Sequence, residues 1–255
     1  MPYQVFTFEQ RPDLVEQAAL FNELGWPIFM CQDPNEQQYW SLLEALFPQF
    51  QLMLCLADEV VAVGSAIPLY WDGTTEGLPD GWGAALAQGI HDFQEKRATN
   101  CASALSVVVH PEHRRKGLSR LVLQAMCATT KEQRLGDLIA PVRPSLKQYY
   151  PHTPINQYVT WQQSDGTPFD SWIRVHWGLG AKILALALES MTVTGSVSQW
   201  AEWTGMSFPN SGEYLVSGAL QPVKIDIAKD YGCYKDPNVW IHHSLSSENH
   251  CSSLL

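Results

Sequence analysis

Apolar positions recur along the chain with two different periods. Runs that alternate or are rich in β-branched residues predict strands, at 3–8, 51–57, 60–69, 102–109, 137–142 and 182–188. Runs with apolar residues every three or four positions predict helices, at 12–24, 35–46, 90–97, 117–131 and 169–177. Because strands and helices are interspersed, we expect an α/β fold with one mixed sheet flanked by helices.

The pattern divides the chain into a core and a smaller C-terminal part. We expect a core over 1–190, with glycine- and proline-rich insertions at 71–100 and 144–168. No polar linker sets off residues 191–243, so we expect them to be an elaboration packed on the core. The polar residues 244–255 are expected to form a disordered tail.

Two local signals predict the structure of the elaboration. Ser196 and Gln199 have the spacing of a capping box, which predicts a short helix ending at Gly205. Residues 214–227 are expected to add one or two strands.

The most informative stretch joins a predicted strand to a predicted helix through a basic turn. It reads Leu105-Ser-Val-Val-Val-His-Pro-Glu-His-Arg-Arg-Lys-Gly-Leu-Ser-Arg120. Pro111 ends the strand, and Gly117 lets the backbone approach a ligand closely. The helix that follows begins with unpaired N–H groups and the positive end of its dipole. This order is typical of sites that bind a phosphate group.

The distribution of charge supports an anion site at this turn. The chain has a net charge of −10, from 16 Lys and Arg against 26 Asp and Glu. Residues 114–147 hold eight of those 16 cations and only two acids, so this window carries +6 and the remainder −16. An acidic protein with one basic segment favours a local ligand over a nucleic-acid surface. The alternative is a solvated basic turn without a ligand.

This stretch resembles the acyl-coenzyme A site of the GNAT superfamily of acyltransferases, which carries Arg/Gln-x-x-Gly-x-Gly/Ala at the turn. Arg114 and Gly117 match, whereas Ser119 departs from the last position. The resemblance implies that acetyl-CoA or another acyl-CoA is the co-substrate, and that a GNAT-like sheet splays between strands 102–109 and 137–142. The implied contacts are Val107, Val108 and Val109 for the pantetheine arm, and Arg114, Arg115, Lys116, Gly117, Leu118, Ser119 and Arg120 for the pyrophosphate.

The resemblance also suggests candidates for the acid that protonates the departing thiolate. Family members often carry a tyrosine four residues before a Gly-Phe pair, and Gly180-Ala181 resembles that pair, which places His176 in the tyrosine position. If residues 144–150 form the equivalent helix instead, Tyr149 or Tyr150 takes this role. Each of these three side chains could equally serve only in packing.

The general base is the least defined part of the site. Family members often have a glutamate near the start of the central strand, but residues 100–103 contain no carboxylate. Asp72 is the leading candidate because Tyr70 and Trp71 could form an aromatic wall for a cationic amine beside it. Its alternative is a turn aspartate before Gly73. Further candidates are Asp80, His91 and Asp92.

Together these features predict an N-acyltransferase that moves an acyl group from acyl-CoA to a small amine by direct attack on the thioester, and the acidic balance outside the basic window favours a cationic amine. The alternatives are a non-catalytic acyl-CoA-binding module and transfer that involves a carrier protein or a thiol. No metal, nucleic acid or membrane partner is expected, since the scattered cysteines lack ligand spacing and no apolar run reaches about 18 residues. We expect a cytoplasmic protein with reduced cysteines.

Overall fold

The computed structural model describes residues 2–245. Nine strands among these residues form one sheet in the order β1-β2-β3-β4-β5-β9-β8-β7, and β6 pairs with β9. Only β4 and β5 run parallel; the other pairs are antiparallel. The strands are β1 (Tyr3–Thr7), β2 (Gln51–Leu56), β3 (Glu59–Leu69), β4 (Cys101–Val109), β5 (Asp137–Val142), β6 (Lys182–Gly195), β7 (Gly212–Tyr214), β8 (Val223–Asp226) and β9 (Tyr231–Ser244).

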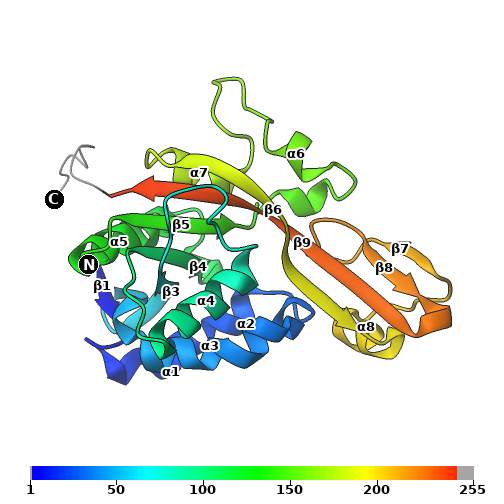
Figure 1. Cartoon of the computed structure of the whole chain (residues 1–255), viewed down its shortest axis with the longest axis horizontal. Helices are drawn as coiled ribbons and strands as arrows, with labels where there is room; N and C mark the ends of the chain where they lie inside the picture. The colour runs from blue at the N-terminus through cyan, green and yellow to red at the C-terminus, as the bar shows by residue number, and fades with distance from the viewer. Residues whose placement is uncertain (1, 246–255) are drawn as a thin grey trace.

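Helices cover both faces of this sheet (Figure 1). The α-helices are α1 (Val15–Ala19), α2 (Phe21–Gly25), α3 (Pro34–Leu46), α4 (Trp82–Gln94), α5 (Leu118–Glu132), α6 (Ile155–Tyr158), α7 (Ser171–Trp177) and α8 (Val197–Thr204). Short 3₁₀ helices lie at Pro12–Leu14, Met30–Gln32, Pro48–Phe50, Pro111–His113, Lys147–Tyr149 and Ile227–Lys229.

Neighbouring residues of β3 show which helices share a face. Gly64 faces α5, because a Cβ there would lie 2.5 Å from the Val122 side chain. Val63 points the other way and packs in a small core with Phe21 of α2. Successive side chains of a strand alternate between the two faces, so α5 and α2 cover opposite faces of the sheet.

The predicted mixed α/β architecture is confirmed, but two helices differ from their predicted bounds. The helix expected over 12–24 is interrupted at Leu20, whose side chain is exposed between α1 and α2. The helix expected at 90–97 instead begins at Trp82. Gly83 lies in the segment expected to be a loop, yet Gly83 and Gly89 are both close-packing positions of α4, where a Cβ would lie 2.7 Å from Asn35 and 2.5 Å from Ile67.

The largest difference is β9, which no sequence pattern predicted. Lys235-Asp-Pro-Asn238 resembles a turn, but the strand continues through it. Pro237 lies where the pairing with β6 shifts register between Ala187 and Met191, and such an irregularity tolerates a residue without an N–H donor. Strand β9 then pairs with β5 from Val239 to Ser244, so the last strand completes the central sheet.

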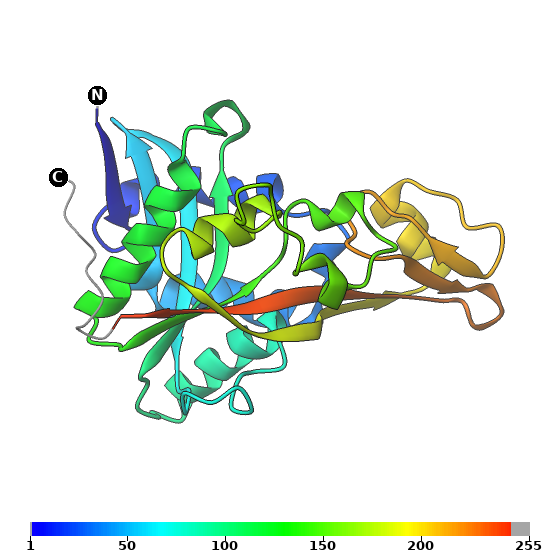
Figure 2. The ribbon, with the colours of Figure 1, turned by 90° about the horizontal axis from the view of Figure 1, so that it is seen from above.

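Strands β6 and β9 also extend well beyond the helix-covered body. Figures 1 and 2 show them as a long twisted ribbon, with α8, β7 and β8 at its far end. Ser196 and Gln199 form the predicted capping box, and α8 ends at Gly205 with a left-handed backbone, as expected. The tail predicted from residue 244 lies outside the described residues from 246 onward, while Ser244 itself ends β9. Within residues 2–245, no helix is both long and apolar enough to cross a membrane.

Candidate active site

The site begins where the two parallel strands separate. Strands β4 and β5 pair only from Cys101 to Ser103, and each then stays bonded to its outer neighbour, β3 or β9. The facing edges beyond this point enclose a cleft of about 500 Å³. Backbone N–H and C=O groups on such edges need partners, so the cleft offers two rows of hydrogen-bonding groups to a ligand.

A β-bulge in β4 lies at the start of the splay. Ser65 pairs with Ser106 and Ala66 with Ala104, so Leu105 is the extra residue. Bulges turn the local backbone and release it from the ladder. The Leu105 carbonyl is held by the indole Nε1 of Trp82, which donates to it at 2.7 Å. This hydrogen bond stabilises the backbone of the bulge. The neighbouring residues 104–109 line the cleft.

The basic turn closes one end of the cleft. Gly117 immediately precedes α5 with a left-handed backbone (φ 76°), which glycine adopts without the strain other residues incur. Arg114 and Ser119 line the cleft together with Val107, Val108 and Val109. The first turn of α5, with its free N–H groups, therefore faces the space between the strands.

Some predicted contact residues use their side chains elsewhere. Leu118 is buried in the main core, and Arg120 donates from Nη2 to the Gly178 carbonyl at 3.0 Å, which ties α5 to the end of α7. Arg115 and Lys116 are exposed on the turn. For Leu118 only the backbone remains as a possible contact, and the backbone N–H of Arg120 already donates to the Gly117 carbonyl at 3.1 Å.

His176 lies in the cleft wall, as the candidate acid must. The ring is 1% exposed, packs against Trp172 with centroids 4.5 Å apart, and lines the cleft. Its Nδ1 atom lies 2.9 Å from Nε2 of His243. Its Nε2 atom is buried and has no hydrogen-bond partner within residues 2–245. Burial lowers the pKa of His176 well below its usual value, and His243 lowers it further, so the ring is neutral at pH 7.

The two tyrosine candidates lie apart from the cleft lining. Tyr149 is 69% exposed. Tyr150 packs in an aromatic cluster with Trp161 and Phe169, at centroid distances of 4.9 and 5.7 Å. Their neighbour Gln148 does line the cleft. Neither tyrosine is among the residues that line the cleft, whereas His176 is.

Asp72 lies at the opposite end of the sheet. It follows β3, whose last residue Leu69 pairs with Cys101 at the start of β4, whereas the cleft adjoins the end of β4. The Asp72 carboxylate accepts hydrogen bonds from the backbone N–H and the hydroxyl of Thr74, both at 2.8 Å. These bonds lower its pKa. The structure thus gives Asp72 the turn-capping role of an aspartate before glycine.

Two arginines near the cleft are engaged within the protein. Arg143 lines the cleft, but its guanidinium pairs with the buried carboxylate of Asp236 at 3.1 Å and donates to the Gly218 carbonyl at 2.6 Å. Arg174 donates to the carbonyls of Pro168 and Phe169. Both side chains therefore hold loops in place around the cleft.

Sequence reasoning missed much of the cleft wall. Ser145, Gln148 and Ser171 line it from the segment after β5 and from α7, and Trp26 lines it from the end of α2. The predicted helix over 169–177 includes Ser171, but nothing in the sequence marked these positions as contacts of a ligand. Within the described chain, no group of three or more His, Cys, Asp or Glu side chains is placed to hold a metal ion.

Comparison with known proteins gives a consistent result. The model of the Acetyltransferase (GNAT) family matches residues 19–149, which include the splayed strand β4 and the basic turn. Arginine N-acetyltransferase avaD of Aspergillus versicolor is 32% identical over 277 residues, which cover 95% of this chain and 94% of that protein.

Solved structures share the fold at low sequence identity. The loading GNATL domain of CurA from Lyngbya majuscula is 15% identical, with a TM-score of 0.57 over 96% of this chain and 98% of that one. The GphF GNAT-like decarboxylase, in complex with isobutyryl-CoA, is 15% identical, with a TM-score of 0.55 over 96% of this chain and 100% of that one. The similarity extends over the C-terminal ribbon as well as the core.

Proposed function

The chain belongs to the GNAT family of acetyltransferases, and we propose that it transfers an acetyl group from acetyl-CoA to an amine of a small cationic acceptor. That it is an acyl-CoA-dependent acyltransferase follows from the family. The observation that carries the proposal is the cleft between β4 and β5, which unites the basic turn and His176. A relative named for arginine supports a cationic acceptor, as does the acidic balance outside the basic window.

The donor fits the cleft by the chemistry of its parts. Arg114 and the N-terminal turn of α5 suit a pyrophosphate, since both present positive charge or N–H groups at one end of the cleft. The backbone of Val107–Val109, beyond the pairing of β4 with β5, suits the amide groups of the pantetheine arm, although the Val109 carbonyl already accepts from Nε of Arg114 at 3.2 Å. Acetyl-CoA supplies the reactive thioester, which this arrangement would direct toward the bulge at Leu105.

His176 is the side chain we assign to proton transfer. The reaction forms an N–C bond, breaks the C–S bond, and moves one proton from the amine to the sulfur. Because His176 is neutral and its buried Nε2 atom lacks a partner in the described chain, it can accept the amine proton there. The resulting imidazolium, disfavoured by burial, then gives that proton to the thiolate. In this proposal His176 acts first as the base and then as the acid, and the acid role is the one predicted from the sequence.

Acetyl transfer assayed over an amine panel tests the proposal. Release of free CoA from acetyl-CoA would be followed with arginine, agmatine, lysine, spermidine and a neutral amine, and each product confirmed by mass spectrometry. We expect transfer to at least one cationic amine. Binding of acetyl-CoA without transfer to any amine would contradict the amine acceptor and leave a carrier protein or a thiol as the alternative.

A further inference from the structure

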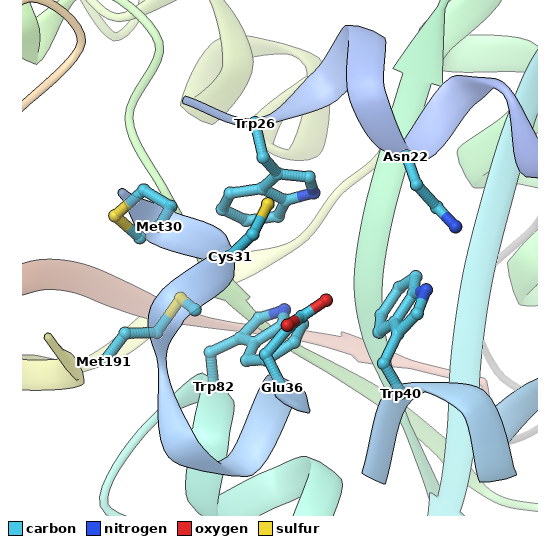
Figure 3. Close-up of a pocket in the computed structure, with 8 residues that line it drawn as sticks. All are labelled: Asn22, Trp26, Met30, Cys31, Glu36, Trp40, Trp82 and Met191. Carbon is cyan, nitrogen blue, oxygen red and sulfur yellow. The ribbon is translucent and has the colours of Figure 1, made fainter. Parts of the chain in front are cut away.

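A second, narrower pocket opens beside the cleft and shares Trp26 with it. It draws on the end of α2, the start of α3, the first residue of α4 and β6 (Figure 3). Its lining residues are Asn22, Trp26, Met30, Cys31, Glu36, Trp40, Trp82 and Met191. With a cavity volume of about 30 Å³, it can receive the end group of a small molecule but not a whole one.

Three indole rings make up most of the pocket wall. Trp40 and Trp82 are nearly parallel, with centroids 5.8 Å apart and an angle of 22°. Trp26 meets Trp82 edge-on, with centroids 5.9 Å apart. Tryptophan faces attract cations more strongly than other aromatic faces do. Packing against the sheet does not by itself explain this arrangement, because Trp26 and Trp40 remain partly exposed around an open space.

Trp82 also joins this pocket to the reaction centre. Its ring lines the pocket, while its Nε1 atom donates to the carbonyl of the bulge residue Leu105 at 2.7 Å. Leu105 in turn lines the acyl-CoA cleft. A molecule whose end group lies against Trp82 would therefore have its remainder directed toward the bulge.

One carboxylate enters the aromatic space. Glu36 follows the N-cap Asp33 by three residues and precedes Trp40 by four, so Glu36 and Trp40 share a face of α3. In Figure 3 the Glu36 carboxylate is drawn over the edge of the Trp82 ring, on the side toward Trp40. The side chain is half-buried and forms no ion pair or hydrogen bond with another side chain described here.

This carboxylate is uncompensated in the protein alone. Burial raises the pKa of Glu36, and the nearby Asp33 raises it further, as happens when a charge loses water without gaining a partner. A position in the first helical turn explains an acidic residue there, but not its burial among indole rings. A cationic ligand would supply the missing partner and the cation–π contacts together.

We propose that this pocket binds a guanidinium or ammonium group at one end of the acceptor, while the amine to be acetylated lies in the cleft beyond Trp26. The inference rests on the proposed function, because it defines the acceptor class of the same site. It selects small amines that carry a second cationic group, such as basic amino acids, guanidino amines and diamines, over amines with a single charge.

The direct test is calorimetric titration with arginine and with citrulline, its neutral urea analogue, in the presence of CoA. We expect arginine to bind at least about tenfold more tightly than citrulline, since a charge-assisted contact is lost in citrulline. Glu36→Gln should remove that preference. Glu132→Gln, the same change on the exposed end of α5, serves as the matched control and should retain it.

Two outcomes would overturn the inference: equal affinity for arginine and citrulline, or an unchanged preference in Glu36→Gln. Trp40→Leu provides an independent variant and should weaken arginine binding, whereas Trp40→Phe should preserve part of it. Thermal unfolding of each variant checks that it is folded.

Parallel acetyl-transfer assays separate this inference from the proposed function. If arginine binding depends on Glu36 but no amine is acetylated, the cation pocket stands and the proposed reaction fails. If cationic amines are acetylated with the same KM in wild type and Glu36→Gln, the reaction stands and the pocket assignment fails.

Discussion

His176 of α7 and His243 of β9 form a buried pair, with Nδ1 of the first 2.9 Å from Nε2 of the second. One ring must donate the shared proton, so the contact couples the tautomers of the two neutral rings. The base role proposed for Nε2 of His176 corresponds to the tautomer in which Nδ1–H of His176 donates to His243. His176 lines the cleft, and its buried Nε2 atom has no partner in the described residues. Strand β9 thus positions the group that we assign to proton transfer.

Replacing His176 should impair turnover much more than donor binding. We expect His176→Phe to lower kcat by about a hundredfold, in the range usual for a lost general acid–base group, with the Kd for acetyl-CoA nearly unchanged. Steady-state kinetics and calorimetry measure the two effects separately. Asp72→Asn, at the far end of the sheet, should leave both unchanged. An unaffected kcat in His176→Phe would return the acid role to Tyr149 or Tyr150.

The histidine pair should also make the protein sensitive to acid. Burial, and secondarily His242, lower the pKa of His243 from 6.5 to about 4, so the unfolded chain binds the proton first. Stability from this site is complete above pH 6.5 and is lost as the pH falls toward the folded value. Relative to His243→Gln, wild type should lose about 2 kcal/mol of unfolding free energy between pH 7.5 and pH 5. Urea titrations at the two pH values measure this difference, and parallel curves for both proteins would contradict it.

The indole bond at the bulge should contribute to both stability and activity. Trp82→Phe leaves the buried Leu105 carbonyl without its donor, which should cost about 1–3 kcal/mol of unfolding free energy beyond the loss of packing. Trp200→Phe is a matched comparison, because Trp200 is equally buried and its Nε1 atom has no partner in the described part of the chain. Trp82→Phe should also lower acetyl transfer. Equal stability losses in the two variants would show that the bond to Leu105 contributes little.

Acceptor binding should weaken in acid through Glu36. Because the pKa of Glu36 is raised, this carboxylate protonates at a higher pH than an ordinary glutamate, and the attraction for a cation disappears with its charge. Arginine affinity should therefore fall as the pH is lowered from about 8 to about 5, while the affinity of Glu36→Gln stays level. A parallel decline in that variant would assign the pH dependence to another group.

Local sequence signals predicted the parts of this protein that depend on neighbouring residues. The strand–turn–helix around Gly117 and the capping box at Ser196 are encoded within a few residues, and both form as expected. The order of the first strands also followed from their apolar patterns. These features were sufficient to predict the family and the mixed sheet, while the acyl-CoA site at the turn stays a prediction.

The remaining features depend on contacts between distant segments. Strand β9 could not be predicted because Pro237 interrupts its sequence pattern. A proline fits within this strand because the pairing with β6 is irregular there. Burial is the main cause of the lowered pKa of His176, and its ring partner His243 lies on β9, 67 residues away in the sequence. Trp26, Glu36 and Trp82 come from separate elements, so no spacing in the sequence indicates their pocket.

The central claim is that the turn around Gly117 holds acetyl-CoA in the β4–β5 cleft, and calorimetric titration with acetyl-CoA tests it most directly. Gly117→Glu would be compared with Gly166→Glu, since both glycines have a left-handed backbone and open space at the Cβ position, but only Gly117 precedes α5. We predict micromolar binding by wild type and Gly166→Glu, and a loss of at least about a hundredfold in Gly117→Glu, whose carboxylate repels the pyrophosphate. Equal affinity in all three proteins would contradict the assignment of the site.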